Sequence, residues 1–137
     1  MGEKTNNWDK LYNKAKEVQN GREISPFIYG GQVSAAIMTD RGNIYVGVCV
    51  DATCGLAVCA ERNAIFNMIT NGESKIDKMV AITSDNRVGA PCGACRELMM
   101  QLHKDSGEIE VLMNYETMEI KKLKELVPDW WGIERFK

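Results

Sequence analysis

QVSAAIMTDRGNIYVGVCV, residues 32–50 of the chain, holds two strand-like runs on either side of a four-residue turn. The runs are residues 32–39 and 44–50, in which apolar and β-branched side chains dominate. Between them, Asp40-Arg41-Gly42-Asn43 is typical of a hairpin turn. We therefore predict that this stretch forms the first two strands of a sheet, paired antiparallel.

The segments before and after this hairpin both carry apolar residues at helical spacing. Residues 8–20 carry Trp8, Leu11, Tyr12, Ala15 and Val18 at helical spacing, and Gly21 follows as a stop signal. Residues 56–70 carry Val58, Ala60, Ala64, Ile65, Met68 and Ile69, and Asn71-Gly72 ends the pattern. Each pattern predicts a helix that packs against the sheet.

The second half of the chain alternates strands and helices. Residues 78–84 form a short apolar run suited to a strand covered on both faces, and Pro91 is well placed to open a helix that continues through Leu102. The remaining expected elements are a strand at 108–114, a weak strand near 118–120, a short helix at 122–126 and an aromatic tail with Trp130, Trp131 and Phe136. This order predicts the α/β class, as a mixed sheet with helices packed on it.

Composition limits the classes of protein to consider. The chain has 137 residues, enough for a single domain over 1–137, with 45% hydrophobic residues, 26% charged residues and a net charge of -2. The charges are interspersed and form no basic stripe, which disfavours a nucleic acid polymer as partner. No apolar stretch has the length of a membrane span, and the amino terminus lacks a signal-peptide pattern. We expect a cytoplasmic protein without a membrane partner.

Three of the five cysteines lie where loops are expected to become helices. Cys59 lies in Cys59-Ala60-Glu61-Arg62, and Cys92 and Cys95 lie in Pro91-Cys92-Gly93-Ala94-Cys95-Arg96. Residues three apart share one face of a helix, so Cys92 and Cys95 can bind one ion together, and Cys59 supplies a third thiolate. Three protein ligands leave the fourth position of a zinc ion open, which is typical of a catalytic site. The pattern predicts Zn²⁺ as the cofactor.

Glu61 is the candidate catalytic residue. Residues two apart point to nearly opposite sides of a helix, so Cys59 and Glu61 can serve one centre only if the helix begins close to Cys59. From that position Glu61 could take a proton from a metal-activated water and return it to a departing amine. This chemistry is the hydrolytic deamination of an amidine-like carbon.

Two arginines are candidates for tuning the metal centre. Three thiolates on one zinc ion carry a net charge of -1, which makes an activated water less acidic unless it is offset. Arg62 and Arg96 each follow a motif residue directly, and we expect their guanidinium groups to hydrogen-bond a ligand sulfur. The positive ends of the two helices are expected to act in the same direction.

Other readings of the cysteines stay open at this stage. A closed structural zinc site would need a fourth donor, for which Cys49, Cys54 and His103 are the candidates, and it would leave Glu61 unexplained. A Cys-x-x-Cys redox pair at 92–95 is a further alternative. Outside these alternatives, we expect His103 to face solvent near a helix end, and the other two cysteines to be small buried fillers.

The paired motifs resemble those of the zinc nucleobase deaminases, which carry a ligand-x-Glu motif followed by Pro-Cys-x-x-Cys. With cysteine at position 59, they look most like the small free-nucleoside cytidine deaminases and their blasticidin S deaminase relatives. The resemblance covers about residues 32–101. It implies a cytidine deaminase-like fold with a five-stranded mixed sheet. It also implies a small-molecule substrate and a homo-oligomer, a homotetramer whose neighbouring subunits help to close each site.

The sequence departs from that family where a sugar would bind. Cytidine deaminases typically carry an Asn-x-Glu pair on the second strand, whereas residues 47–51 read GVCVD, with Asp51 as the only nearby acid. The aromatic residue expected before the first strand's Val-x-Ala-Ala run is replaced by Gly31. Tyr29 and Phe27 could stack on a base instead, and a plain core role fits them equally well.

These observations support one leading hypothesis and leave others open. The leading hypothesis is a zinc-dependent deaminase that converts an aminopyrimidine or a related small amidine, such as cytidine, to the oxo product with release of ammonia. A blasticidin S-type antibiotic deaminase is the nearest alternative. A catalytically silent zinc-binding assembly module, with the aromatic tail at its interfaces, belongs to a different class. An editing deaminase acting on nucleic acid is disfavoured by the acidic balance.

Overall fold

Strand β2, Ile28–Thr39, is the central strand of the computed structural model, which describes residues 3–136. It pairs antiparallel with β3, Ile44–Ala52, in a register that sets Ile37 opposite Tyr45. The predicted hairpin is therefore confirmed, with its turn at 40–43. The register of β2 shifts between Gly30 and Ser34, so an irregular stretch interrupts its pairing with β3.

The other strands extend this hairpin into a mixed sheet of six strands. β4, Ile76–Ile82, runs antiparallel to β2, and β5, Glu110–Asn114, runs parallel to β4. β6, Glu119–Lys122, closes one edge antiparallel to β5, and β1, Arg22–Ser25, pairs antiparallel with the start of β2. The mixed α/β sheet is as predicted. It has one strand more than the five expected, and the added strand is β1.

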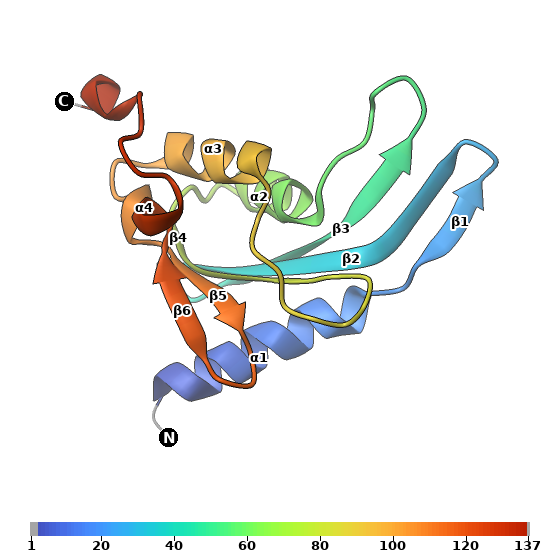
Figure 1. Cartoon of the computed structure of the whole chain (residues 1–137), viewed down its shortest axis with the longest axis horizontal. Helices are drawn as coiled ribbons and strands as arrows, with labels where there is room; N and C mark the ends of the chain where they lie inside the picture. The colour runs from blue at the N-terminus through green and yellow to red at the C-terminus, as the bar shows by residue number, and fades with distance from the viewer. Residues whose placement is uncertain (1–2, 137) are drawn as a thin grey trace.

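Helices cover both faces of the sheet (Figure 1). α1, Glu3–Val18, lies on one face, while α2, Ala60–Thr70, and α3, Gly93–Leu102, lie together on the other. After β6 the chain forms the short helix α4, Leu123–Leu126, and ends in the 3₁₀ turn η2, Ile133–Phe136. A further 3₁₀ turn, η1, Ser106–Glu108, precedes β5. Among residues 3–136, none of the helices combines the length and the apolarity that a membrane crossing requires.

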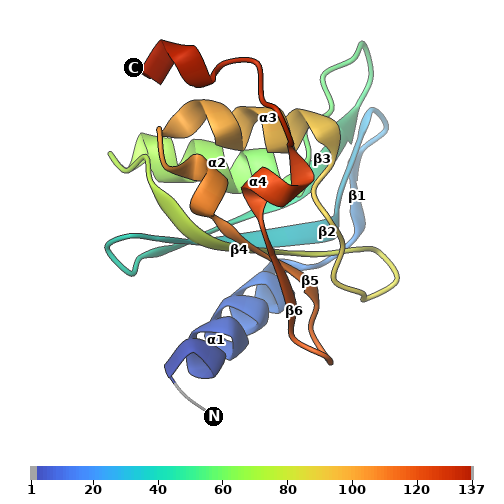
Figure 2. The same cartoon turned by 60° about the vertical axis from the view of Figure 1, so that its left-hand side comes forward.

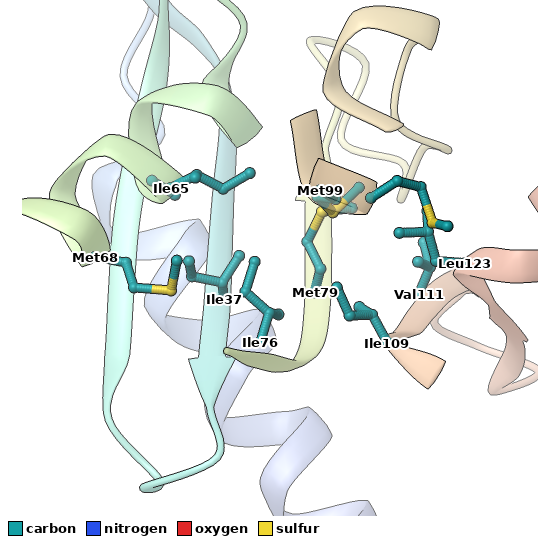
Figure 3. Packing of buried hydrophobic residues seen from close by; sticks show 11 residues of the cluster. Ile37, Ile65, Met68, Ile76, Met79, Met99, Ile109, Val111 and Leu123 are labelled. Carbon is teal, nitrogen blue, oxygen red and sulfur yellow. The ribbon is translucent and has the colours of Figure 1, made fainter. Parts of the chain in front are cut away.

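Alternation along β2 divides the core into two layers. Ile37 points toward α2 and α3, where it joins Ile65, Met68, Met79 and Met99 in the cluster that Figure 3 shows. Ala36 and Met38 belong to the layer under α1, together with the fully buried Trp8, Leu11, Val80 and Leu112. Full burial of such a side chain contributes about 1.5–3 kcal/mol. The first layer therefore holds α2 and α3 on one face of the sheet, and the second holds α1 on the other.

The helix expected at 56–70 begins later in the structure, at Ala60. Residues 53–57 form a turn in which Cys54 and Gly55 have positive φ angles of 61° and 72°. Val58 then forms an isolated antiparallel bridge with Val50, in which each backbone N–H donates to the other residue's carbonyl at 2.9 and 3.0 Å. This bridge delays the helix, so that Cys59 is the residue directly before it.

Candidate metal centre

Two of the candidate ligands are the residues at which the helices α2 and α3 begin. Cys59 is the N-cap residue of α2 and Cys92 that of α3, and both have extended backbone conformations, with φ/ψ of -73°/152° and -70°/170°. The prediction that the helix begins close to Cys59 is confirmed. Neither side chain makes a capping hydrogen bond. Each sulfur is therefore free to turn toward the space between the two helix ends, where the helix dipoles are positive.

The third sulfur completes a compact group. The Sγ of Cys92 lies 3.5 Å from that of Cys59 and 3.4 Å from that of Cys95, and all three lie within 4.8 Å of one another. Sulfurs bound tetrahedrally to one zinc ion at about 2.3 Å are about 3.8 Å apart. The three thiols therefore fit a single zinc ion after a small outward movement.

The pKa values of Cys92 and Cys95 are shifted in opposite directions. Burial, followed by repulsion from the charge of Glu61, raises the pKa of the Cys95 thiol. For Cys92, burial acts in the same direction but is outweighed by hydrogen bonds from backbone N–H groups and the neighbouring thiols, so its pKa is lowered. A thiolate at Cys95 is therefore disfavoured unless a positive ion lies beside it, and thiolate ligands favour zinc over harder ions.

In the described part of the chain, no fourth His, Cys, Asp or Glu side chain closes this site. Within residues 3–136, these cysteines are the only group of three or more His, Cys, Asp or Glu ligand atoms close enough to share an ion. Cys49 is buried and accepts a hydrogen bond from the backbone N–H of Val33, while His103 ends α3 beside Asp105. Cys54, expected to be a buried filler, is exposed instead. A closed four-ligand site is therefore not supported.

Glu61 occupies the first turn of α2, two residues after Cys59. Only 6% of its surface is exposed. Burial is the main reason why its pKa is raised above 4.5, and a backbone hydrogen bond and the charge of Arg62 partly oppose this shift. A carboxyl group with a raised pKa, beside Cys95, is suited to accept a proton and to release it again.

Arg62 makes the contact that its position predicts. Its Nη2 donates to the Sγ of Cys59 at 3.4 Å, and the guanidinium also interacts with Cys95. Its Nε is buried and has no hydrogen-bond partner among the described residues. The side chain thus places one positive charge beside the sulfurs of Cys59 and Cys95, where it stabilises their thiolate forms.

The expectation for Arg96 is corrected by the structure. Its Nε donates to the carbonyl of Pro91 at 2.8 Å, and its Nη1 donates to the carbonyl of Leu126 at 3.1 Å. No hydrogen bond from Arg96 to a ligand sulfur occurs among residues 3–136. The side chain turns back along its own helix and toward the carboxyl-terminal segment, so both of its partners are main-chain oxygens.

Near the expected sugar-binding region, Asp51 has a hydrogen-bond partner and two aromatic rings line a cavity. The Oδ2 of Asp51 accepts a hydrogen bond from the Nε2 of Gln32 at 2.6 Å, a partner that the sequence did not predict. Tyr29 and Phe27, 45% and 68% exposed, line a cavity of about 250 Å³ together with Asp51, so a core role for the two rings is excluded in the single chain.

Gly31 has a steric reason for replacing an aromatic residue. Its φ is 89°, and a Cβ at this position would collide with the carbonyl oxygen of Asn20. The backbone N–H of Asn20 donates to the carbonyl of Gly31 at 2.8 Å, which holds the end of the α1 segment against β2. Only glycine allows this close approach. The chain segment after α1 thus passes where the Cβ of a ring-bearing side chain would have to be.

Comparisons with known proteins agree with this geometry. A family profile described as the cytidine and deoxycytidylate deaminase zinc-binding region matches residues 7–109, a range that includes the three cysteines, Glu61 and both arginines. A cytidine deaminase of Halalkalibacterium halodurans is 35% identical over 89 residues, which cover 64% of this chain and 67% of that protein.

Two further relatives extend the comparison. A blasticidin-S deaminase of Bacillus cereus is 40% identical over 82 residues, covering 53% of this chain and 59% of that protein. The crystal structure of a cytidine deaminase from Burkholderia pseudomallei superposes with a TM-score of 0.71 at 28% identity, covering 90% of this chain and 98% of the other. Because the profile spans most of the chain and the fold matches throughout, this protein belongs to the cytidine and deoxycytidylate deaminase family.

Proposed function

We propose that this protein is a zinc-dependent hydrolytic deaminase in which Cys59, Cys92 and Cys95 hold the metal and Glu61 transfers the protons. The observation that supports this most directly is the meeting of three sulfurs, at 3.4 and 3.5 Å, beside one buried carboxyl group where two helices begin. Family membership gives the same reaction class.

In the proposed reaction, Glu61 transfers the two protons of one water molecule in turn. Zinc, when bound, supplies a Lewis acid that makes a water molecule nucleophilic near neutral pH. Glu61 accepts one proton from the attacking water and delivers it to the ring nitrogen beside the reacting carbon. It then transfers the remaining hydroxyl proton to the amino nitrogen, so that the carbon–nitrogen bond breaks, ammonia leaves and the oxo group forms. One water is consumed for each ammonia released. The raised pKa of Glu61 brings its proton affinity closer to what both transfers require.

Arg62 offsets the charge of the ligands in this proposal. Three thiolates and one Zn²⁺ sum to a charge of -1, which opposes the activation of water. The guanidinium of Arg62, 3.4 Å from the sulfur of Cys59, withdraws part of that charge, as do the amino-terminal ends of α2 and α3.

The proposed substrate is a small molecule with a 4-aminopyrimidine ring. Cytidine is the first candidate, because relatives of this chain are cytidine deaminases. Blasticidin S is the second, because a blasticidin-S deaminase is 40% identical to it. The absence of the Asn-x-Glu pair, together with glycine at position 31, implies that any sugar is held differently here. Asp51, oriented by Gln32, is the acidic group placed on that strand.

We also propose that the protein assembles as a homo-oligomer, with a tetramer as the expected form. Large apolar side chains are exposed on the outer side of α2, at Phe66 and Ile69, 45% and 48% exposed. Others are exposed near the β1–β2 hairpin, at Ile24 and Phe27, 50% and 68% exposed. Copies of the chain would cover such side chains. The cytoplasm is the proposed location, because free cysteines such as the five of this chain persist in a reducing compartment.

The test is an ammonia-release screen with the zinc-loaded protein. Substrates are cytidine, deoxycytidine, cytosine, blasticidin S and guanine, and two variants are compared with the parent. Glu61→Gln should keep zinc and thermal stability but lose about 10²–10⁴-fold in rate, because only proton transfer is removed. Cys92→Ala should lose zinc. A fully zinc-loaded parent that releases ammonia from none of these compounds would favour the zinc-binding assembly module instead.

A further inference from the structure

The three candidate ligands differ in how firmly the backbone holds them. Cys95 lies inside α3 and is fully buried. Cys59 follows Val58, whose two hydrogen bonds to Val50 fix the backbone just before the ligand. Cys92 has neither support, because it is exposed and lies before the first residue of α3. Of the three ligands, Cys92 therefore depends most on a contact supplied from elsewhere.

Arg96 supplies that contact. The carbonyl of Pro91 belongs to the same rigid peptide plane as the backbone nitrogen of Cys92. By donating to this carbonyl at 2.8 Å, the Nε of Arg96 fixes the plane and with it the direction in which the Cys92 side chain leaves the backbone. Long side chains in helices point back toward the amino terminus, so a residue at position 96 can reach the start of its own helix.

The same guanidinium is anchored at its far side. Its Nη1 donates to the carbonyl of Leu126, the last residue of α4, at 3.1 Å. The segment after α4 returns along α3 (Figure 2), where Glu97 accepts hydrogen bonds from the indole N–H groups of Trp130 and Trp131 at 3.1 to 3.3 Å. The carboxyl-terminal segment is thus attached to the helix that carries two ligands. The carbonyl of Leu126, at the start of this attached segment, is therefore a fixed hydrogen-bond partner for Arg96.

We propose that Arg96 is a positioning residue for the metal: it bridges the carbonyls of Pro91 and Leu126 and thereby holds Cys92 in place for zinc. This inference rests on the proposed function, since it takes the three cysteines as the zinc ligands. It assigns the arginine that follows the second motif a role in retaining the metal through main-chain oxygens, distinct from the contact of Arg62 with sulfur.

The test measures how fast zinc leaves the native protein. Arg96→Met keeps the side-chain stem and removes both hydrogen bonds, whereas Arg96→Lys keeps the charge on a single donor group. Arg22→Lys, on the exposed strand β1, is the matched control. Zinc transfer to the chromophoric chelator 4-(2-pyridylazo)resorcinol should be about 10–100-fold faster for Arg96→Met, faster by a smaller factor for Arg96→Lys, and unchanged for Arg22→Lys.

Two further measurements separate positioning from plain stability. Thermal unfolding of the metal-free variants shows whether the fold itself is weakened, and the visible absorption of the Co²⁺-substituted proteins reports the ligand geometry. An altered Co²⁺ spectrum in Arg96→Met, with faster zinc transfer well below its unfolding temperature, supports the inference. Transfer within twofold of the parent and an unchanged spectrum would overturn it. If the parent itself binds no zinc, the proposed function fails, which is a different result.

Discussion

Glu73 is a buried acidic residue, only 7% exposed, next to the β2–β3 turn. Its Oε2 accepts hydrogen bonds from the hydroxyl of Tyr45 at 2.6 Å and from the side-chain amide of Asn43 at 2.8 Å. The hydroxyl of Tyr45 contributes most to lowering the pKa of Glu73 below its ordinary value of 4.5, followed by Thr39. Donors from the hairpin stabilise the charged carboxylate through Oε2, while Oε1 is buried without a hydrogen-bond partner among the described residues.

These hydrogen bonds predict a pH-dependent contribution to stability. Because the folded pKa of Glu73 is below 4.5, its contribution is fully present above pH 4.5 and is lost as the pH falls through the folded pKa. Tyr45→Phe should therefore unfold at a lower temperature than the parent at pH 7, and the difference should shrink below pH 4. Thermal unfolding followed by circular dichroism at both pH values measures this. A difference that stays constant or grows at low pH would contradict it.

At the scale of single residues, the sequence predicted most of the candidate site. The cysteines, Glu61 and the contact of Arg62 with sulfur follow from local spacing near the start of a helix. The partners of Arg96 could not be predicted, because one of them, Leu126, is 30 residues away along the chain. Gln32, the partner of Asp51, was missed for the same reason, since it is 19 residues away.

Among the elements, the contact between α2 and the hairpin controls where the metal centre lies. Gly47 on β3 faces α2, and a Cβ there would lie 2.8 Å from the carbonyl oxygen of Ala60 and from the carbonyl carbon of Asn63. Because these are backbone atoms, they cannot move aside alone. The glycine allows the first turn of α2, with Glu61, to lie directly on the sheet.

Gly47→Ala should therefore push α2 away from β3. Overpacking of this kind costs roughly 1–3 kcal/mol in the free energy of unfolding, and it should also weaken zinc binding because Cys59 moves with the helix. Urea unfolding with and without zinc measures both effects. Gly93→Ala is the control, since a Cβ at that position meets nothing within 4 Å and alanine favours the helix, so stability should not fall. Equal stability of the two variants would show that the helix does not depend on this contact.

Element boundaries were predictable to within two residues for β3, for β5 and for the end of α1, whereas α1 begins at Glu3, five residues before the expected start at Trp8. β1 was missed because its sequence, REIS, has one apolar residue and is exposed along most of its length. It is a strand only because the start of β2 offers it an edge. The late start of α2 was likewise set by the bridge between Val50 and Val58, a contact that local periodicity does not contain.

For the whole molecule, the family fold was predictable and the sheet was larger than expected, with six strands. The resemblance covered about residues 32–101, whereas the fold similarity to a solved cytidine deaminase covers 90% of the chain. Residues outside the motifs carry little sequence signal, because any apolar residues of suitable size can fill the two core layers.

The exposed apolar side chains of α2 predict self-association. A protein that buries Phe66 and Ile69 between subunits should dissociate when both are replaced by glutamate, because charges would be buried without partners. Sedimentation velocity should show the parent as an oligomer and the Phe66→Glu, Ile69→Glu variant as a smaller species. Asn13→Glu, on the exposed side of α1, should not change the sedimentation coefficient. A parent protein that is monomeric at micromolar concentration would refute the proposal.

Cys59 and Cys92 stand at the boundaries of α2 and α3 without capping them, and this has a consequence for how the chain matures. The first turns of both helices and the three candidate sulfurs lie close together, so zinc binding would also order the two helix ends. Without zinc, these two turns are the expected places for transient opening, and hydrogen–deuterium exchange of their backbone amides would be fast. Zinc binding at the motif cysteines would then complete the folding of the two helix ends.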